Sequence, residues 1–128
     1  MNEAEIQILL DAWLDGCESE RDTPEFERNF WAIDQVMGLR IKPDDCWNFI
    51  LAAYKPAVER GQEACLTAGP IEDLLTHWGE QYVERFVELA KKDECFNYVL
   101  GGVWHVTGMK DHVFAQIEDV RKQDWSWT

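Results

Sequence analysis

Apolar side chains recur along this chain at the spacing of an α-helix, and this pattern constrains the fold more than any other feature of the sequence. Near the amino terminus they stand at i, i+3, i+4, i+7 and i+8, which places them on one helical face. These residues are Ile6, Leu9, Leu10, Trp13 and Leu14. No segment of useful length alternates polar and apolar residues as a strand does. The sequence therefore predicts an all-α fold.

Glycine and proline residues divide the pattern into short helices. We expect Gly16 to end the first helix, and Pro24 to start the second after the cap residue Thr23. Pro43 opens a third helix, which Pro56 breaks or kinks. The expected buried stripe of the second helix is Phe26, Phe30, Ile33 and Met37, with Trp31 beside it and partly exposed.

The second half of the chain continues in the same way. A weaker helix over 57–67 ends at Gly69, the next runs from Pro70 to Gly79, and a clear amphipathic helix covers 80–92. A helix around 96–103 and a last one around 113–120 follow. We expect seven or eight short helices in an irregular antiparallel bundle or a short helical-repeat-like array.

The length is that of one domain, residues 1–128, with residues 123–128 as a flexible tail. The tryptophans at helical positions are expected in the core: Trp13, Trp47, Trp78 and Trp104. For Trp125 and Trp127 in the tail two interpretations stay open. They dock back on the helices, which we favour, or they anchor an interface.

The charge is strongly acidic and unevenly distributed. The formal net charge is −13, and residues 1–27 hold nine acids against one base, Arg21. Phosphate backbones would be repelled, so direct nucleic-acid binding is disfavoured, whereas a basic protein partner would be attracted and steered in. The plain alternative is that the acidity only keeps the protein soluble.

The cysteines, the first residues and the apolar runs of the chain predict the compartment in which the protein is found. Cys17, Cys46, Cys65 and Cys95 form no C-x-x-C pair, the first residues MNEAEIQ do not resemble a signal peptide, and no apolar run is long enough to span a membrane. We expect a cytoplasmic protein with reduced thiols and no membrane contact.

A corner motif lies in the middle of the chain, in the segment AGPIEDLL. Gly69 is expected to take a positive φ and end one helix, and Pro70 to start the next, so that Glu72 and Asp73 fall in its positively polarised first turn. Asp73 and His77 stand at i and i+4 and pair on one face, where Arg85 and His105 would complete a polar cluster. We favour a structural corner over a small polar pocket in which the two acids act as acid and base.

The same segment, together with DECFNYVLGGVWHV further on, resembles the bacterial family of domains of unknown function DUF6869. The resemblance covers about half the chain, from Cys65 to about Val120, and implies the helical fold but no activity. Trp78 stands between the histidine and the glycine of the pattern, and Glu94 stands where proline is usual. The residues that fit the pattern are Ala68, Gly69, Pro70, Glu72, Asp73, Leu74, Leu75, His77, Gly79, Asp93, Phe96, Leu100, Gly102, Val103 and Trp104.

The motifs of catalysis are missing from the sequence. The three histidines are far apart, no H-E-x-x-H or E-x-x-H pair occurs, and neither a nucleophile elbow nor a phosphate-binding glycine loop is present. A Cys–His pair formed only in the fold stays open. We therefore expect no catalytic residues, no metal and no cofactor.

Two functional hypotheses follow. The first is a non-enzymatic acidic binding protein, an immunity protein or inhibitor that masks a basic toxin or nuclease. Its contact surface would be Asp11, Asp15, Glu18, Glu20, Asp22 and Glu25, with Trp31 as anchor. The alternative is a structural or regulatory helical module with a small polar pocket around Glu72, Asp73 and His77, near Trp104. The sequence does not specify the oligomeric state.

Overall fold

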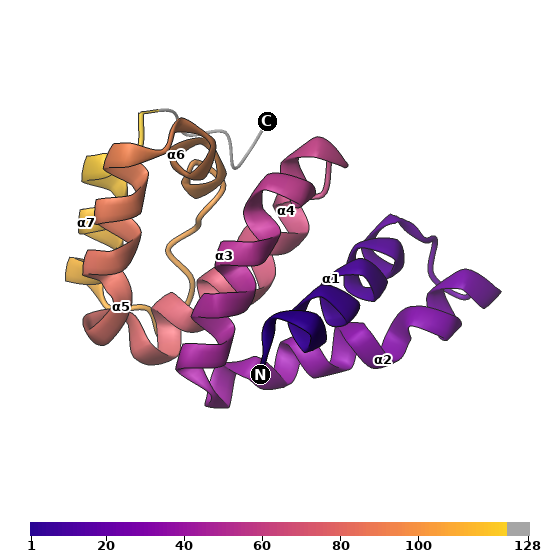
Figure 1. Ribbon diagram of the computed structural model, residues 1–128. Coiled ribbons are helices and arrows are strands. Elements are labelled where there is room, and N and C mark those ends of the chain that lie inside the picture. The colour runs from indigo at the N-terminus through magenta and orange to yellow at the C-terminus, as the bar shows by residue number, and fades with distance from the viewer. Residues whose placement is uncertain (123–128) are drawn as a thin grey trace.

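The computed structural model describes residues 1–122, which fold into helices joined by short connections (Figure 1). The helices are α1 (Glu3–Glu18), α2 (Pro24–Gly38), α3 (Pro43–Glu59), α4 (Glu63–Leu66), α5 (Glu72–Lys92), α6 (Glu94–Leu100) and α7 (Asp111–Val120). A 3-10 turn, Leu39–Ile41, follows α2, and a π-helical segment, Thr67–Ile71, joins α4 to α5. The all-α prediction is confirmed, since residues 1–122 contain no strand. Trp125, Trp127 and the predicted tail lie outside the described residues.

The helices form an irregular bundle with α3 in the middle (Figure 1). On one side α1 and α2 form an antiparallel pair, and on the other α5 packs against α6 and α7. The amino terminus lies beside the start of α3, where the Met1 ammonium is 3.3 Å from Asp45 Oδ1. The buried residues of these helices form one contiguous apolar core.

The first helix ends later than its glycine predicts. A capping box between Asn2 and Glu5 starts α1, which then continues past Gly16 to Glu18. A Cβ at Gly16 would lie 3.1 Å from Ile33 Cδ1, tighter than an ordinary contact. Gly16 therefore allows α1 and α2 to approach closely, and the expectation that it ends the helix is wrong.

The buried face of α2 differs from the predicted stripe. Its buried residues are Ala32 and Val36, whereas Phe30 and Met37 are 46% and 47% exposed. Small side chains suit the close approach to α1, so the large side chains are turned outward. Trp31 is also exposed, at 47%, in line with its expected position beside the stripe.

Proline does not interrupt α3. The helix continues through Pro56 to Glu59, because Pro56 lies close to the end and costs only one amide donor. The Pro56 carbonyl still accepts a hydrogen bond from the Arg60 amide at 3.0 Å, and Ala57 is fully buried. The predicted break at Pro56 is therefore wrong.

The corner motif also differs from its prediction. Gly69 has φ −105° and ψ −105°, so it does not adopt a positive φ, and Pro70 lies within the π-helical segment. Helix α5 begins at Glu72 and passes through Gly79 with a kink at Trp78, where φ is −135° and ψ is 23°. The two helices predicted on either side of Gly79 are therefore one kinked helix.

Aromatic rings fill the centre of the core. Phe49, Phe86 and Phe96 are fully buried, and the partly buried ring of Trp47 lies 4.9 Å from that of Phe86. Trp13 is buried and meets Phe49 edge-on at 5.4 Å.

Two other predicted core positions are not buried as expected. Trp78 is only partly buried, and its indole N–H donates to the Arg40 carbonyl at 2.7 Å. Trp104 is 54% exposed because it follows α6 in an irregular connection, so its predicted place in the core is wrong.

Candidate functional site

Three predicted contact residues share the exposed face of α1. Asp11, Asp15 and Glu18 stand at i, i+4 and i+7, and each is exposed. Arg60, just after α3, reaches two of them: its Nη2 lies 2.7 Å from Asp15 Oδ1 and its Nε 2.5 Å from Glu18 Oε1. The hydrogen bond from Arg60 holds the pKa of Glu18 below its usual value. One cation that is distant in the sequence therefore offsets part of this negative charge.

The structure brings Asp15 and Glu18 together with Glu25 across the α1–α2 pair. They line a surface hollow of about 430 Å³, which we call the acidic hollow. It is lined by Asp15, Glu18, Ser19, Glu25, Arg28 and Asn29. Half of the six acids predicted as a contact surface thus gather in one place.

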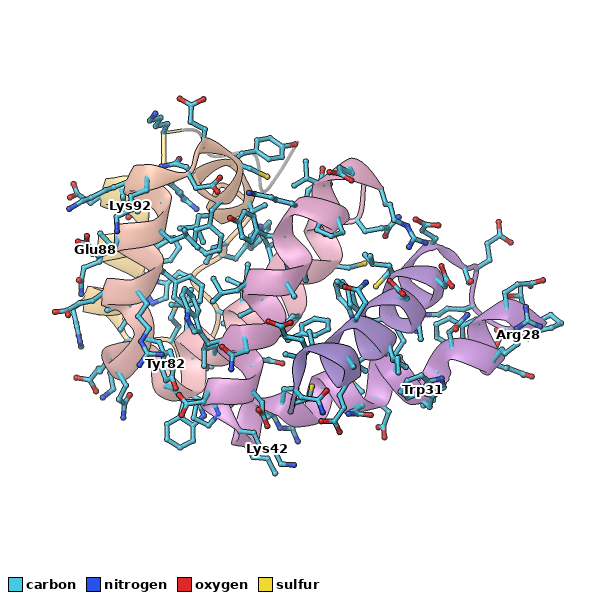
Figure 2. All side chains as sticks on the ribbon, viewed as in Figure 1. Arg28, Trp31, Lys42, Tyr82, Glu88 and Lys92 are labelled. Atoms are coloured by element: carbon cyan, nitrogen blue, oxygen red, sulfur yellow. The ribbon has the colours of Figure 1, made fainter. Side chains whose placement is uncertain are left out.

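The remaining predicted contact residues lie outside the lining of this hollow. Glu20 and Asp22 are exposed in the connection between α1 and α2, where Asp22 adopts a φ of 64°. Asp11 accepts a hydrogen bond from Gln7 one turn before Asp15. Figure 2 shows Arg28 near the start of α2 and Trp31 further along the same helix.

The corner motif holds two neighbouring carboxyl groups in different surroundings. Glu72 is 8% exposed, and its Oε2 accepts the Trp104 backbone N–H at 2.9 Å. Burial raises the pKa of Glu72 above its ordinary value. Burial also raises the pKa of the partly buried Asp73, while the nearby charges of His77 and Arg40 act in the opposite direction.

The expected partners of this cluster lie elsewhere. Arg85 packs over the ring of Tyr82, with 4.6 Å from its guanidinium carbon to the ring centroid. His105 stacks on Phe114 at 4.8 Å and hydrogen-bonds the Met109 carbonyl at 2.9 Å. Arg40 acts on Asp73 instead, because the turn after α2 packs against α5. The predicted contribution of Arg85 and His105 is therefore wrong.

Two cavities flank the corner motif, and Ala68 lies in the wall of both. The Asp73 cavity, of about 250 Å³, is lined by Trp13, Cys17, Ile33, Val36, Met37, Cys65, Ala68, Gly69, Pro70 and Asp73. The Glu72 cavity, of about 270 Å³, is lined by Ala64, Thr67, Ala68, Glu72, Gly102, Trp104 and Val106. His77 is exposed and lines neither of the two. The single pocket predicted around Glu72, Asp73 and His77 is therefore wrong, and its two acids do not face each other across one ligand.

Sequence reasoning missed one pair of residues, Cys17 and Cys65. Both line the Asp73 cavity, although one comes from α1 and the other from α4. No spacing rule links positions so far apart, so the sequence offered no signal for their meeting. Within residues 1–122, no group of three or more His, Cys, Asp or Glu side chains is arranged to hold a metal ion.

These features define an acidic, all-α bundle protein with a conspicuous corner between α4 and α5. The chain belongs to the family of unknown function DUF6869, whose model matches residues 19–125. This match is wider than the stretch that carries the resemblance in the sequence, and it confirms the predicted family. No curated protein and no solved structure matches the chain. Across the part that the structure describes, no helix is both long and apolar enough to cross a membrane.

Proposed function

We propose that this protein is a non-enzymatic, acidic binding protein of the bacterial cytoplasm, an immunity protein or inhibitor that masks a basic toxin or nuclease. The observation that carries the proposal is the acidic hollow, where Asp15, Glu18 and Glu25 meet on a chain of net charge −13. Asp11, Glu20 and Asp22 stand exposed on the same helical pair and its connection.

The arrangement suits a cationic protein surface. Exposed carboxylates raise the association rate of a basic partner, and this steering weakens as salt screens the charges. Arg60 and Arg28 are the basic side chains at the hollow, and Arg60 already neutralises part of it. A partner arginine or lysine would therefore gain most from the carboxylates that Arg60 does not hold, and Trp31, exposed on α2, offers an aromatic anchor.

The test reverses two acids that Arg60 does not hold. Asp11→Lys/Glu25→Lys is compared with the matched control Glu118→Lys/Asp119→Lys, which makes the same charge change at exposed positions of α7. Association with the product of the neighbouring open reading frame is measured at low and at physiological salt. We expect the first variant to lower the association rate about tenfold at low salt and the control to change it little.

Two results would contradict the proposal. Tight binding that is unaffected by salt and by the Asp11→Lys/Glu25→Lys change would show that another surface carries the interaction. Equal losses in both double variants would mean that net charge, and not this helical pair, attracts the partner.

A second candidate function rests on the Asp73 cavity. Its walls are largely apolar, yet the partly buried carboxyl of Asp73 lies among them, as in a pocket for an apolar ligand with a cationic group. Benzylamine is a suitable probe, and its binding is followed by calorimetry in the wild type and in Asp73→Ala. If the variant folds and loses benzylamine binding, the cavity is a site. If it only melts at a lower temperature and the wild type binds nothing, the corner is architectural.

A further inference from the structure

Two thiols that are distant in the sequence meet where α1 packs near α4. Cys17 lies in the last turn of α1 and Cys65 in α4, and both side chains are partly buried in the wall of the Asp73 cavity. The two side chains are close enough for each to shift the pKa of the other. Cys65 Sγ also lies 3.6 Å from Gln62 Oε1. Both side chains therefore line one cavity, and neither residue is fully buried.

The two thiols differ in how readily they ionise. The hydrogen bond from Cys17 lowers the pKa of Cys65, because it stabilises the Cys65 thiolate. The same bond, together with burial, raises the pKa of Cys17, which keeps its proton. The pair thus consists of Cys65, whose thiol ionises more readily, and Cys17, whose thiol stays protonated. This is the arrangement of a reactive cysteine beside a resolving one.

The other two cysteines lack this arrangement. Cys46 is fully buried and donates to the Pro70 carbonyl at 3.6 Å, and burial raises its pKa to about 12. Burial raises the pKa of Cys95 as well. Of the chain's four cysteines, only Cys65 has a lowered pKa.

We propose that Cys17 and Cys65 are a redox modification site, at which hydrogen peroxide forms a reversible disulfide between α1 and α4. The Cys65 thiolate attacks one peroxide oxygen, so an S–O bond forms, the O–O bond breaks, and the leaving hydroxide takes a proton to become water. The Cys17 sulfur then attacks the Cys65 sulfur, an S–S bond forms, and the S–O bond breaks. The hydroxide released takes the Cys17 proton. Two thiols lose two electrons, and one peroxide becomes two waters.

The bond joins two parts of the molecule described above. It ties the end of α1 to α4 across the wall of the Asp73 cavity. It also lies next to Glu18, one of the two acids that Arg60 holds at the acidic hollow. A low-molecular-weight thiol reverses it by exchange. The inference does not depend on the proposed partner, because it concerns only this chain and an oxidant.

The experiment treats the folded full-length chain with hydrogen peroxide, then unfolds it and alkylates the remaining thiols. Intact mass gives the number of free thiols, and peptide mapping gives the cross-link. We expect free thiols to fall from four to two, with one disulfide joining the peptides of Cys17 and Cys65. Dithiothreitol should restore all four.

Single variants assign the roles. Cys17→Ser should leave a sulfenic acid on Cys65 that dimedone traps, and Cys65→Ser should leave its three other thiols unoxidised. Cys95→Ser, the matched control, should form the disulfide as the wild type does. Circular dichroism checks that each variant folds. Peptide mapping of the wild type tests for the disulfide even if a variant fails to fold.

Three results would overturn the inference. They are four free thiols after oxidation, a disulfide that includes Cys46 or Cys95, or a Cys65 that proceeds to sulfinic acid without cross-linking.

Discussion

Glu72 shows what a single residue does at the corner between α4 and α5. Its carboxyl is buried, yet it accepts the Trp104 N–H at 2.9 Å, which fixes the connection after α6 against the start of α5. A buried carboxylate is costly unless its hydrogen bonds replace water. Because burial dominates, the pKa of Glu72 is raised, and the group favours folding most when it is protonated.

This shift predicts how stability depends on pH. The folded-state pKa of Glu72 lies above the ordinary value of 4.5, so its contribution is complete below pH 4.5 and is lost as pH rises through the folded-state pKa. Glu72→Gln keeps an oxygen acceptor for Trp104 and removes the charge. We expect the variant to melt higher than the wild type at neutral pH and to lose this advantage below pH 4.5. Glu118→Gln, at an exposed position of α7, is the control and should show no such crossover. A constant difference at every pH would contradict the assignment.

Helices approach one another closely in this molecule because glycines stand at their contacts. Gly79 lies inside α5, and a Cβ there would come within 2.9 Å of Val113 Cγ1 on α7. Val113 is fully buried, so its side chain has little room to move. Gly79 thus sets the distance between α5 and α7, although glycine is the poorest helix former after proline.

The element-scale prediction compares two glycines. Alanine in a helix interior is intrinsically favoured over glycine by about 1 kcal/mol, whereas a clash in a packed core costs about 1–3 kcal/mol. Gly79→Ala should therefore lower the free energy of unfolding by about 1 kcal/mol. Gly38→Ala, where nothing lies within 4 Å of the added methyl, should raise it by up to about 1 kcal/mol. Urea denaturation measures both. A gain of stability at both positions would show that glycine does not set the α5–α7 distance.

The whole molecule is dominated by its negative charge. With 25 acidic and 12 basic residues, like charges repel over most of the surface of a 128-residue chain. Such repulsion destabilises the compact state, and salt screens it within about 10 Å at 0.1 M. Ion pairs such as Arg60 with Asp15 weaken under the same screening, but exposed pairs contribute little.

Melting temperature should consequently rise with sodium chloride. Between about 10 mM and about 300 mM sodium chloride we expect the melting temperature to increase by roughly 3 °C. Screened charges repel one another less in the folded protein, so unfolding relieves less repulsion. The Asp11→Lys/Glu25→Lys variant should show a smaller increase, since its net charge is closer to zero. Differential scanning calorimetry measures both proteins in the same buffers. A melting temperature that falls with salt would mean that ion pairs outweigh the repulsion.

Local signals in the sequence determined the helical class, several helix boundaries and the charge. The i, i+3, i+4 spacing of Ile6, Leu9 and Leu10 is a property of one helix, so it needs no partner to be recognised. Pro24 and Pro43 mark the starts of α2 and α3 for the same reason, since their fixed φ suits a first helical turn. The corner motif and the family could likewise be recognised from the chain alone.

Tertiary contacts decided the rest, because they join residues whose separation in the sequence carries no signal. Gly16 was expected to end a helix, but the close approach of Ile33 makes it a point of contact between α1 and α2. The burial of Ala32 in place of Phe30 follows from that contact. The cavities on either side of Ala68 separated two acids that are neighbours in the chain. The meeting of Cys17 with Cys65, like that of Arg60 with Asp15, arose only when α1 packed beside the ends of α3 and α4. Periodicity predicts which residues turn inward, but only packing determines which of them meet.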